Sequence, residues 1–223
     1  MSQALNAVIV EPKQPANACV IWLHGLGADG HDFEDVIPSL HLPATHRIRF
    51  IFPHAPAIPV SLNNKMIMPA WFDIFGLGGD SLQDEAGIRK SEGWLKGVLN
   101  DLIAEDIPSE KIFLVGFSQG GALALHTALR FEKPLAGVAG LSTYLPLHEN
   151  LANEQNKANQ FISIFLAHGL MDPVVSYWMG QKSLAYLKDA GYDPLWHDYP
   201  IAHTVCLPEL QSLGRWFKDL LAD

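Results

Sequence analysis

The chain has 223 residues, of which 48% are hydrophobic and 17% are charged. This composition predicts one globular domain over residues 1–223 with a sizeable core and argues against a disordered chain. The formal net charge is −9 at pH 7. It argues against nucleic acid or an anionic membrane surface as the main partner, because both are negatively charged.

The cysteines and the lengths of the apolar runs both bear on where the protein is located. Cys19 and Cys206 are the chain's cysteines, and Cys19 falls in an apolar run. We expect both to be reduced, in a cytoplasmic protein. Met1–Val10 has no basic residue to begin a signal peptide. No run approaches the roughly 18 apolar residues that span a bilayer, so we expect no stable membrane insertion.

Short apolar runs alternate with amphipathic segments along the chain. Asn6–Val10 is expected to form an antiparallel edge strand. Six further runs have the length of strands, and several have the composition of parallel strands buried on both faces. They are Ala18–Leu23, Ile48–Phe52, Ile112–Phe117, Leu135–Leu141, Phe161–Ala167 and Leu195–Tyr199. Helical spacing is found in His31–Leu40, Asp84–Glu105, Gln119–Phe131, Val174–Ala190 and Pro208–Leu221.

This alternation predicts an α/β fold: a three-layer sandwich with a mostly parallel sheet and helices on both faces. In such sheets the chemistry lies at the carboxyl ends of the strands. Ala55–Gly79 departs from the pattern, because it is rich in proline and apolar residues but has little helical periodicity. It is either an irregular loop folded onto the core or a flap that lines an apolar site, and one segment can do both.

A candidate nucleophile follows the run that ends at Phe117. Gly116–Gly120 has the pattern G-x-S-x-G between a predicted strand and a predicted helix. In this context the serine, Ser118, lies on a sharp turn at the top of the sheet, and side chains at Gly116 and Gly120 would collide across that turn. The alternative is a glycine-rich junction at which Ser118 only caps the helix.

A serine hydroxyl needs a base, and in this arrangement an acid and then a histidine follow on later loops. Asp172 follows the run Phe161–Ala167, and His203 follows Leu195–Tyr199. Asp172 could instead act only as a helix cap. Of the ten histidines, His24 and His168 are expected to bond loop backbone, since each precedes a glycine at a strand end. No zinc-site spacing is present, so we expect no metal.

Two backbone N–H groups are expected to stabilise the oxyanion of acyl transfer. One belongs to Gln119, directly after the serine. The other should come from the glycine-rich loop after the first parallel strand, where we choose Leu26. This loop also reads G-x-G-x-x-G, but no acidic residue near position 50 ends the next strand to hold a ribose. We therefore expect no nucleotide cofactor.

Seven segments together resemble the acyl-protein thioesterase and small carboxylesterase family of the α/β-hydrolases, also described as phospholipase/carboxylesterase. They span nearly the whole chain in the family's order: Leu23–Gly30, Phe52–Pro56, Ala70–Asp73, Gly116–Gly121, Leu141–Pro146, His168–Val174 and Tyr199–Val205. The resemblance implies Ser118 as nucleophile, His203 as base and Asp172 as its orienting acid. It also implies Leu26 and Gln119 as oxyanion donors.

The resemblance further implies hydrolysis of carboxylic esters and, in some members, of thioesters on acylated proteins or of lysophospholipids. It places acyl-chain contacts at six positions: Met66, Met68, Trp71, Leu77, Leu145 and Val174. It also implies a capacity to form homodimers. Thr204 stands where serine often follows the histidine, and Leu170-Met171 are bulkier than usual, which leaves the acyl preference open.

Three alternatives to a carboxylesterase or thioesterase stay open at this stage. One is a lysophospholipase or other lipid-ester hydrolase, which the acidic composition makes less favoured. Another is a different hydrolase, such as a peptidase or lactonase, on the same scaffold. The third is a catalytically silent binding module, which would have a broken set of catalytic residues, whereas every member is present here.

Overall fold

The computed structural model of the chain describes residues 5–76, 78 and 81–222. Seven strands form the main sheet: β1 Ala7–Val10, β2 Ala18–Leu23, β3 Ile48–Pro53, β6 Ile112–Phe117, β7 Gly137–Leu141, β8 Ser163–Gly169 and β9 Leu195–Tyr199. Their order across the sheet is β1-β3-β2-β6-β7-β8-β9. β1 is antiparallel to β3 at the edge, as predicted, and every other neighbouring pair is parallel.

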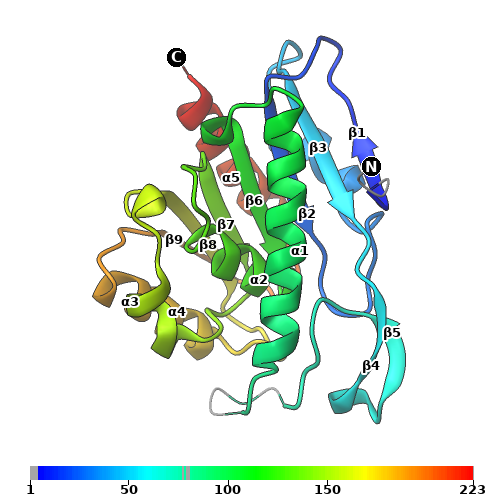
Figure 1. Cartoon of the computed structure of the whole chain (residues 1–223), viewed down its shortest axis with the longest axis vertical. Helices are drawn as coiled ribbons and strands as arrows, with labels where there is room; N and C mark the ends of the chain where they lie inside the picture. Colours follow the sequence, from blue (N-terminus) through cyan, green and yellow to red (C-terminus); the bar gives the residue numbers. More distant parts are fainter. Residues whose placement is uncertain (1–4, 77, 79–80, 223) are drawn as a thin grey trace.

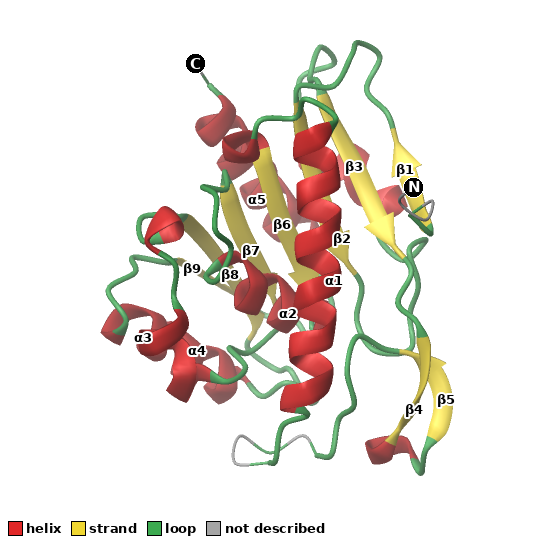
Figure 2. Cartoon of the chain, viewed as in Figure 1, coloured by secondary structure: helices red, strands yellow, loops and turns green. Residues whose placement is uncertain are grey.

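Helices cover both faces of this sheet (Figures 1 and 2). They are α1 Glu85–Ala104, α2 Gln119–Ala128, α3 Leu151–Glu154, α4 Tyr177–Asp189 and α5 Leu207–Leu221. Side chains of α1, α2 and α4 share one buried cluster with one face of the sheet. Those of α5 and the 3-10 turn Glu34–Leu40 share a second cluster with the other face. The predicted three-layer α/β sandwich with a mostly parallel sheet is thus confirmed, and none of the described helices is both long and apolar enough to cross a bilayer.

The register of the parallel strands brings their carboxyl ends to one edge of the sheet. Leu23 lies opposite Gly116, and Phe117 lies opposite Leu141. At the same carboxyl ends, in the last two strands of the order, Gly169 of β8 lies opposite Tyr199 of β9. The loops that begin after these residues therefore meet at the same edge, although they come from distant parts of the chain.

The strand predictions are confirmed to within two residues, but one predicted helix is wrong. His31–Leu40 contains turns and then a 3-10 turn from Glu34 to Leu40, with Pro38 inside it. Proline lacks the N–H that an α-helical interior needs, so an α-helix does not continue through Pro38. The helix expected from Val174 begins later, at Tyr177.

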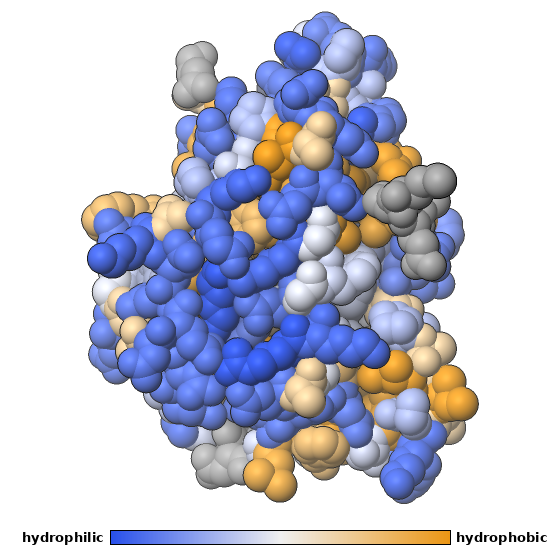
Figure 3. Space-filling view, in the orientation of Figure 1, coloured by the Kyte–Doolittle hydropathy of each residue, from blue (hydrophilic) through white to orange (hydrophobic). Residues whose placement is uncertain are grey.

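The proline-rich segment after β3 is more regular than we expected. Strands β4 Ala57–Val60 and β5 Met66–Pro69 pair as an antiparallel hairpin outside the main sheet. Asn64 and Lys65, with φ of 54° and 60°, make its turn. Apolar side chains gather on the surface of this hairpin (Figure 3), where Ile67 is 72% exposed. The chain then turns inward, and Ala70–Phe72 is buried.

Candidate active site

The turn that carries Ser118 has the tight geometry that its glycines predict. Ser118 joins β6 to α2 with a φ of 53°, a conformation that L residues rarely adopt. A Cβ on Gly116 would lie 2.2 Å from the carbonyl carbon of Gly120. One on Gly120 would lie 2.3 Å from the Leu23 oxygen. The backbone N–H of Ser118 donates to Leu141 O at 2.9 Å, which fixes the turn against β7.

Asp172 and His203 are joined by a short hydrogen bond. His203 Nδ1 lies 2.7 Å from Asp172 Oδ2, and the Asp172 side chain is fully buried. The other carboxylate oxygen accepts the N–H groups of Val174 at 2.8 Å and Val175 at 3.0 Å. Asp172 therefore orders the turn before α4 and also holds the imidazole. The sequence left open whether Asp172 caps the following segment or orients His203. Its two carboxylate oxygens make contacts of both kinds.

Backbone contacts fix the two loops that carry this pair. Leu170 N donates to Tyr199 O at 2.8 Å, and Met171 N donates to Ile201 O at 3.0 Å. Gly169 ends β8 beneath this contact, where a Cβ would lie 2.4 Å from Ala202 O. The histidine loop approaches β8 closely because residue 169 has no side chain.

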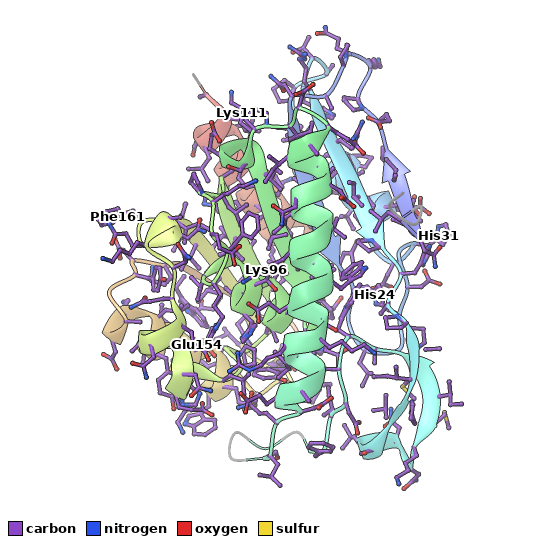
Figure 4. All side chains as sticks on the ribbon, viewed as in Figure 1. His24, His31, Lys96, Lys111, Glu154 and Phe161 are labelled. Carbon is purple, nitrogen blue, oxygen red and sulfur yellow. The ribbon has the colours of Figure 1, made fainter. Side chains whose placement is uncertain are left out.

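Two other histidines at strand ends bond backbone groups, as predicted. His24 Nε2 accepts the N–H of Ala55 at 3.1 Å, and its Nδ1 lies 2.8 Å from Gly25 O. It stands between the main sheet and the β4–β5 hairpin (Figure 4). His168 Nε2 lies 2.8 Å from Val175 O. Burial lowers the pKa of both imidazoles below the ordinary value, so the neutral form is favoured in each.

A cavity of about 280 Å³ lies at the carboxyl edge of the sheet. Ser118, His203, Leu26 and Gln119 all contribute to its lining. The Phe117 ring lies 4.7 Å from the His203 ring, centroid to centroid. Within the described residues no hydrogen bond joins the Ser118 hydroxyl to His203, and such bonds often tighten only when substrate is bound. The cavity therefore brings together the alcohol, the imidazole and both candidate oxyanion residues.

The candidate oxyanion donors have free N–H groups. Neither Leu26 N nor Gln119 N donates to an acceptor among the described residues. Gln119 is the first residue of α2, whose N-terminus favours negative charge nearby. Both groups are thus available to a bound oxygen at the cavity wall.

A four-residue segment, Pro69–Phe72, ties these two positions together. Gly27 N, next to Leu26, donates to Pro69 O at 2.8 Å. The side-chain amide of Gln119 accepts the N–H of Trp71 at 3.0 Å and donates to Phe72 O at 2.7 Å. We call this segment the brace, because it bonds to both sides of the oxyanion region.

The predicted substrate contacts divide into three groups. Leu145 and Val174 line the cavity. Trp71, Met66 and Met68 are absent from its described lining: Trp71 is buried in the brace, Met66 is 64% exposed on the hairpin, and Met68 contacts the Asn63 amide. Leu77 lies outside the described residues.

The sequence interpretation missed much of the cavity wall. Trp178, Lys182 and Tyr186 line it from α4, and Tyr144 lines it from the loop after β7. Trp178 is 47% exposed, and an exposed tryptophan on a predicted helix is the one signal that could have pointed to this wall. No three His, Cys, Asp or Glu side chains in the described part of the chain group as a metal site would need.

Comparison with known proteins identifies the relatives of this arrangement. Residues 4–220 match the family described as Phospholipase/Carboxylesterase. The chain is 38% identical to an acyl-protein thioesterase 1 from Mycosarcoma maydis, over 97% of this chain and 98% of the relative. It is also 38% identical to an acyl-protein thioesterase 1 from Neurospora crassa, over 92% and 87% of the two chains.

Solved structures give the same result. Zea mays acyl-protein thioesterase 2 superimposes with a TM-score of 0.87 at 31% identity, over 97% of this chain and 99% of the other. Arabidopsis thaliana SOBER1 superimposes with a TM-score of 0.88 at 31% identity, over 92% and 100% of the two chains.

Proposed function

This chain belongs to the phospholipase/carboxylesterase family of α/β-hydrolases and is a hydrolase, and on that premise we propose that Ser118, His203 and Asp172 form its catalytic triad. The substrates we propose are carboxylic esters and acyl thioesters, including acyl groups on protein cysteines. The activity is assigned to the chain as one α/β-hydrolase domain in the cytoplasm, where the free thiols of Cys19 and Cys206 persist.

The proposal rests on one observation above all. The hydroxyl-bearing turn and the imidazole line the same cavity, and the imidazole Nδ1 is bonded to a buried carboxylate. With Nδ1 at 2.7 Å from Asp172, Nδ1 carries the proton and Nε2 is left as the acceptor. In this tautomer His203 Nε2 can remove a proton from an alcohol that comes within hydrogen-bonding distance.

The reaction then has two steps. His203 Nε2 takes the Ser118 proton while Ser118 Oγ attacks the acyl carbon, and the carbonyl electrons move onto its oxygen. The N–H groups of Leu26 and Gln119 stabilise that oxyanion. His203 gives its proton to the departing alcohol or thiol, which leaves an acyl-enzyme. A water molecule, deprotonated by His203, repeats the attack and releases the carboxylic acid and Ser118.

Replacing Ser118 with alanine tests the proposal. We expect S118A to lower kcat for a short-chain p-nitrophenyl ester by at least about 10³-fold, because the nucleophile is removed. A fluorophosphonate probe should label the wild type at Ser118 and leave S118A unlabelled. Thermal unfolding should change little, since alanine fits the same turn.

Ser176→Ala provides a matched control. Ser176 is exposed near the start of α4, and its side chain makes no capping hydrogen bond. S176A should keep the wild-type rate and the probe label. Turnover by S118A near the wild-type rate would refute the assignment of the nucleophile.

A further inference from the structure

Helix α4 forms one wall of the cavity with a single face. Trp178, Lys182 and Tyr186 line the cavity and are spaced four residues apart. This spacing puts them on one side of the helix, with successive residues about 6 Å apart along its axis. The cavity therefore extends along α4 for about two turns, with Lys182 at the middle of the wall.

The Lys182 ammonium has a defined position but no ion pair with any described residue. Nζ lies 4.0 Å from the centre of the Trp178 ring, a cation–π contact that orients the side chain. No Asp or Glu in the described part of the chain lies within 4.0 Å of it. Among the described residues that line the cavity, Lys182 is the only Lys or Arg.

Three carboxylates line the cavity: Asp32 is exposed to solvent, and Asp73 and Asp84 are already engaged by donors. Asp73 accepts both the N–H and the hydroxyl of Ser61, at 2.7 Å and 2.6 Å. Asp84 accepts Gly87 N at 3.0 Å at the start of α1, and Asp73 N at 2.9 Å. These groups shape the wall and are held by donors of their own, so they are not available to the ammonium.

Most of the remaining lining is apolar. Phe72, Ile74, Leu145, Val174 and Met179 line the same cavity as Lys182. An acyl chain that filled such a space would displace water from Lys182 Nζ and supply no polar partner in its place. Desolvating the charge in this way is unfavourable. A carboxylate at the far end of the chain would supply the missing partner, in surroundings where charge pairs are stronger than in water.

We propose that Lys182 is a specificity residue that binds a terminal carboxylate of the acyl group, so that the site accepts esters and thioesters of dicarboxylic acids. The inference rests on the proposed function of the same cavity. Water still cleaves the ester or thioester bond at Ser118, and the terminal carboxylate is unchanged by the reaction.

The test compares p-nitrophenyl monoesters of dicarboxylic acids with six, eight and ten carbons. Each is measured beside the neutral fatty acyl ester and the terminal carboxamide of equal length. The carboxamide separates charge from polarity, and the range avoids short diacids, whose free carboxylate cleaves the ester unaided. Hydrolysis without enzyme is subtracted throughout.

The variant Lys182→Met keeps the length of the side chain and removes its charge. At the chain length that reaches the ammonium, K182M should lose at least about fivefold of the wild-type preference in kcat/KM for carboxylate over carboxamide. The loss should fall mainly on the KM of the carboxylate substrate. Lys188→Met is the matched control: it removes the same charge from an exposed position of α4 outside the cavity lining, and its preference should stay that of the wild type.

The outcomes separate the two proposals. If no enzyme form cleaves the neutral esters, the proposed function fails. If the neutral esters are cleaved but K182M and wild type show the same ratio at every length, Lys182 only covers the cavity with its aliphatic stem and the inference is wrong. An equal loss in K188M would also overturn it, because the effect would then arise from net charge.

Discussion

At the scale of single residues, Asp172 shows how one buried carboxylate serves two structures. One oxygen accepts the N–H groups of Val174 and Val175, and the other lies 2.7 Å from His203 Nδ1. Removing the whole side chain would disturb both, so a truncation would not separate ordering of the turn from ordering of the imidazole. An asparagine separates the two effects. Its amide oxygen can still accept the N–H groups of Val174 and Val175, whereas its NH₂ group would donate to His203 Nδ1 instead of accepting from it.

Asp172→Asn is expected to lower kcat for a p-nitrophenyl ester by about 10⁴-fold, because the amide would stabilise the imidazole tautomer whose Nε2 already carries a proton. The melting temperature should fall by only a few degrees, since the amide oxygen still accepts the two backbone N–H groups. Steady-state kinetics and calorimetry on the same preparation check both. A D172N protein with wild-type kcat would mean that Asp172 acts only on the turn.

Among elements, the contact between β8 and the histidine loop depends on Gly169. A Cβ there would lie 2.4 Å from Ala202 O and 2.5 Å from Ile201 O, and both atoms are backbone. Neither can rotate away as a side chain could. The loop that holds His203 would therefore have to move as a unit.

Gly169→Ala should destabilise the fold by about 1–3 kcal/mol, the usual cost of overpacking, and should reduce kcat as the loop shifts. Chemical denaturation and ester kinetics measure the two effects. Gly93→Ala is the control, because Gly93 is exposed in α1 and an added Cβ meets nothing within 4 Å. That change should leave kcat alone and stabilise the protein by up to about 1 kcal/mol. Equal stability of G169A and wild type would show that the loop tolerates the shift.

Elements also show how far the sequence could predict this structure. Ala18–Leu23 and Ile112–Phe117 were predicted to the residue, because nearly every side chain in them is buried and the apolar run has clear ends. His31–Leu40 was wrong because its apolar spacing is compatible with either helix type, and Pro38 decides between them.

The candidate site was predictable only in part, for a related reason. Residues directly after strands are expected at one edge of the sheet, which is how Ser118, Asp172 and His203 were chosen. The wall formed by Trp178, Lys182 and Tyr186 was missed. Helical spacing indicates that these residues share a face, but it does not reveal which distant segment that face meets.

For the molecule as a whole, buried ionisable groups set the pH range of stability. Burial lowers the pKa of His24, His126 and His168 below the ordinary 6.5. Unfolding exposes these imidazoles, which then take up protons below pH 6.5, so stability falls on the acid side. Burial of Glu209, in the first turn of α5, raises its pKa from 4.5 to about 8. Its carboxyl is neutral in the folded protein and ionises on unfolding, so the stabilisation contributed by Glu209 falls as pH rises from 4.5 through about 8.

The free energy of unfolding should therefore be greatest near pH 6.5. Glu209→Gln keeps a neutral side chain of the same shape and removes the ionisation. In this variant the decline from pH 6.5 to pH 8 should become much shallower, as measured by urea denaturation at a series of pH values. Glu149→Gln removes a charge from a side chain that is 58% exposed and should keep the wild-type profile. A wild-type profile in E209Q would show that the carboxyl is already ionised in the folded protein.

The brace links the β4–β5 hairpin to the oxyanion region. Pro69–Phe72 contacts no reacting atom, yet it bonds to Gly27 on one side of the oxyanion region and to the Gln119 amide on the other. The separation of two donors that follow the neighbouring strands β2 and β6 is thereby tied to one short stretch of chain. Insertions or exchanges in β5 should accordingly alter the speed of the acylation step more than the strength of substrate binding, so that a peripheral hairpin tunes the chemistry from outside the cavity.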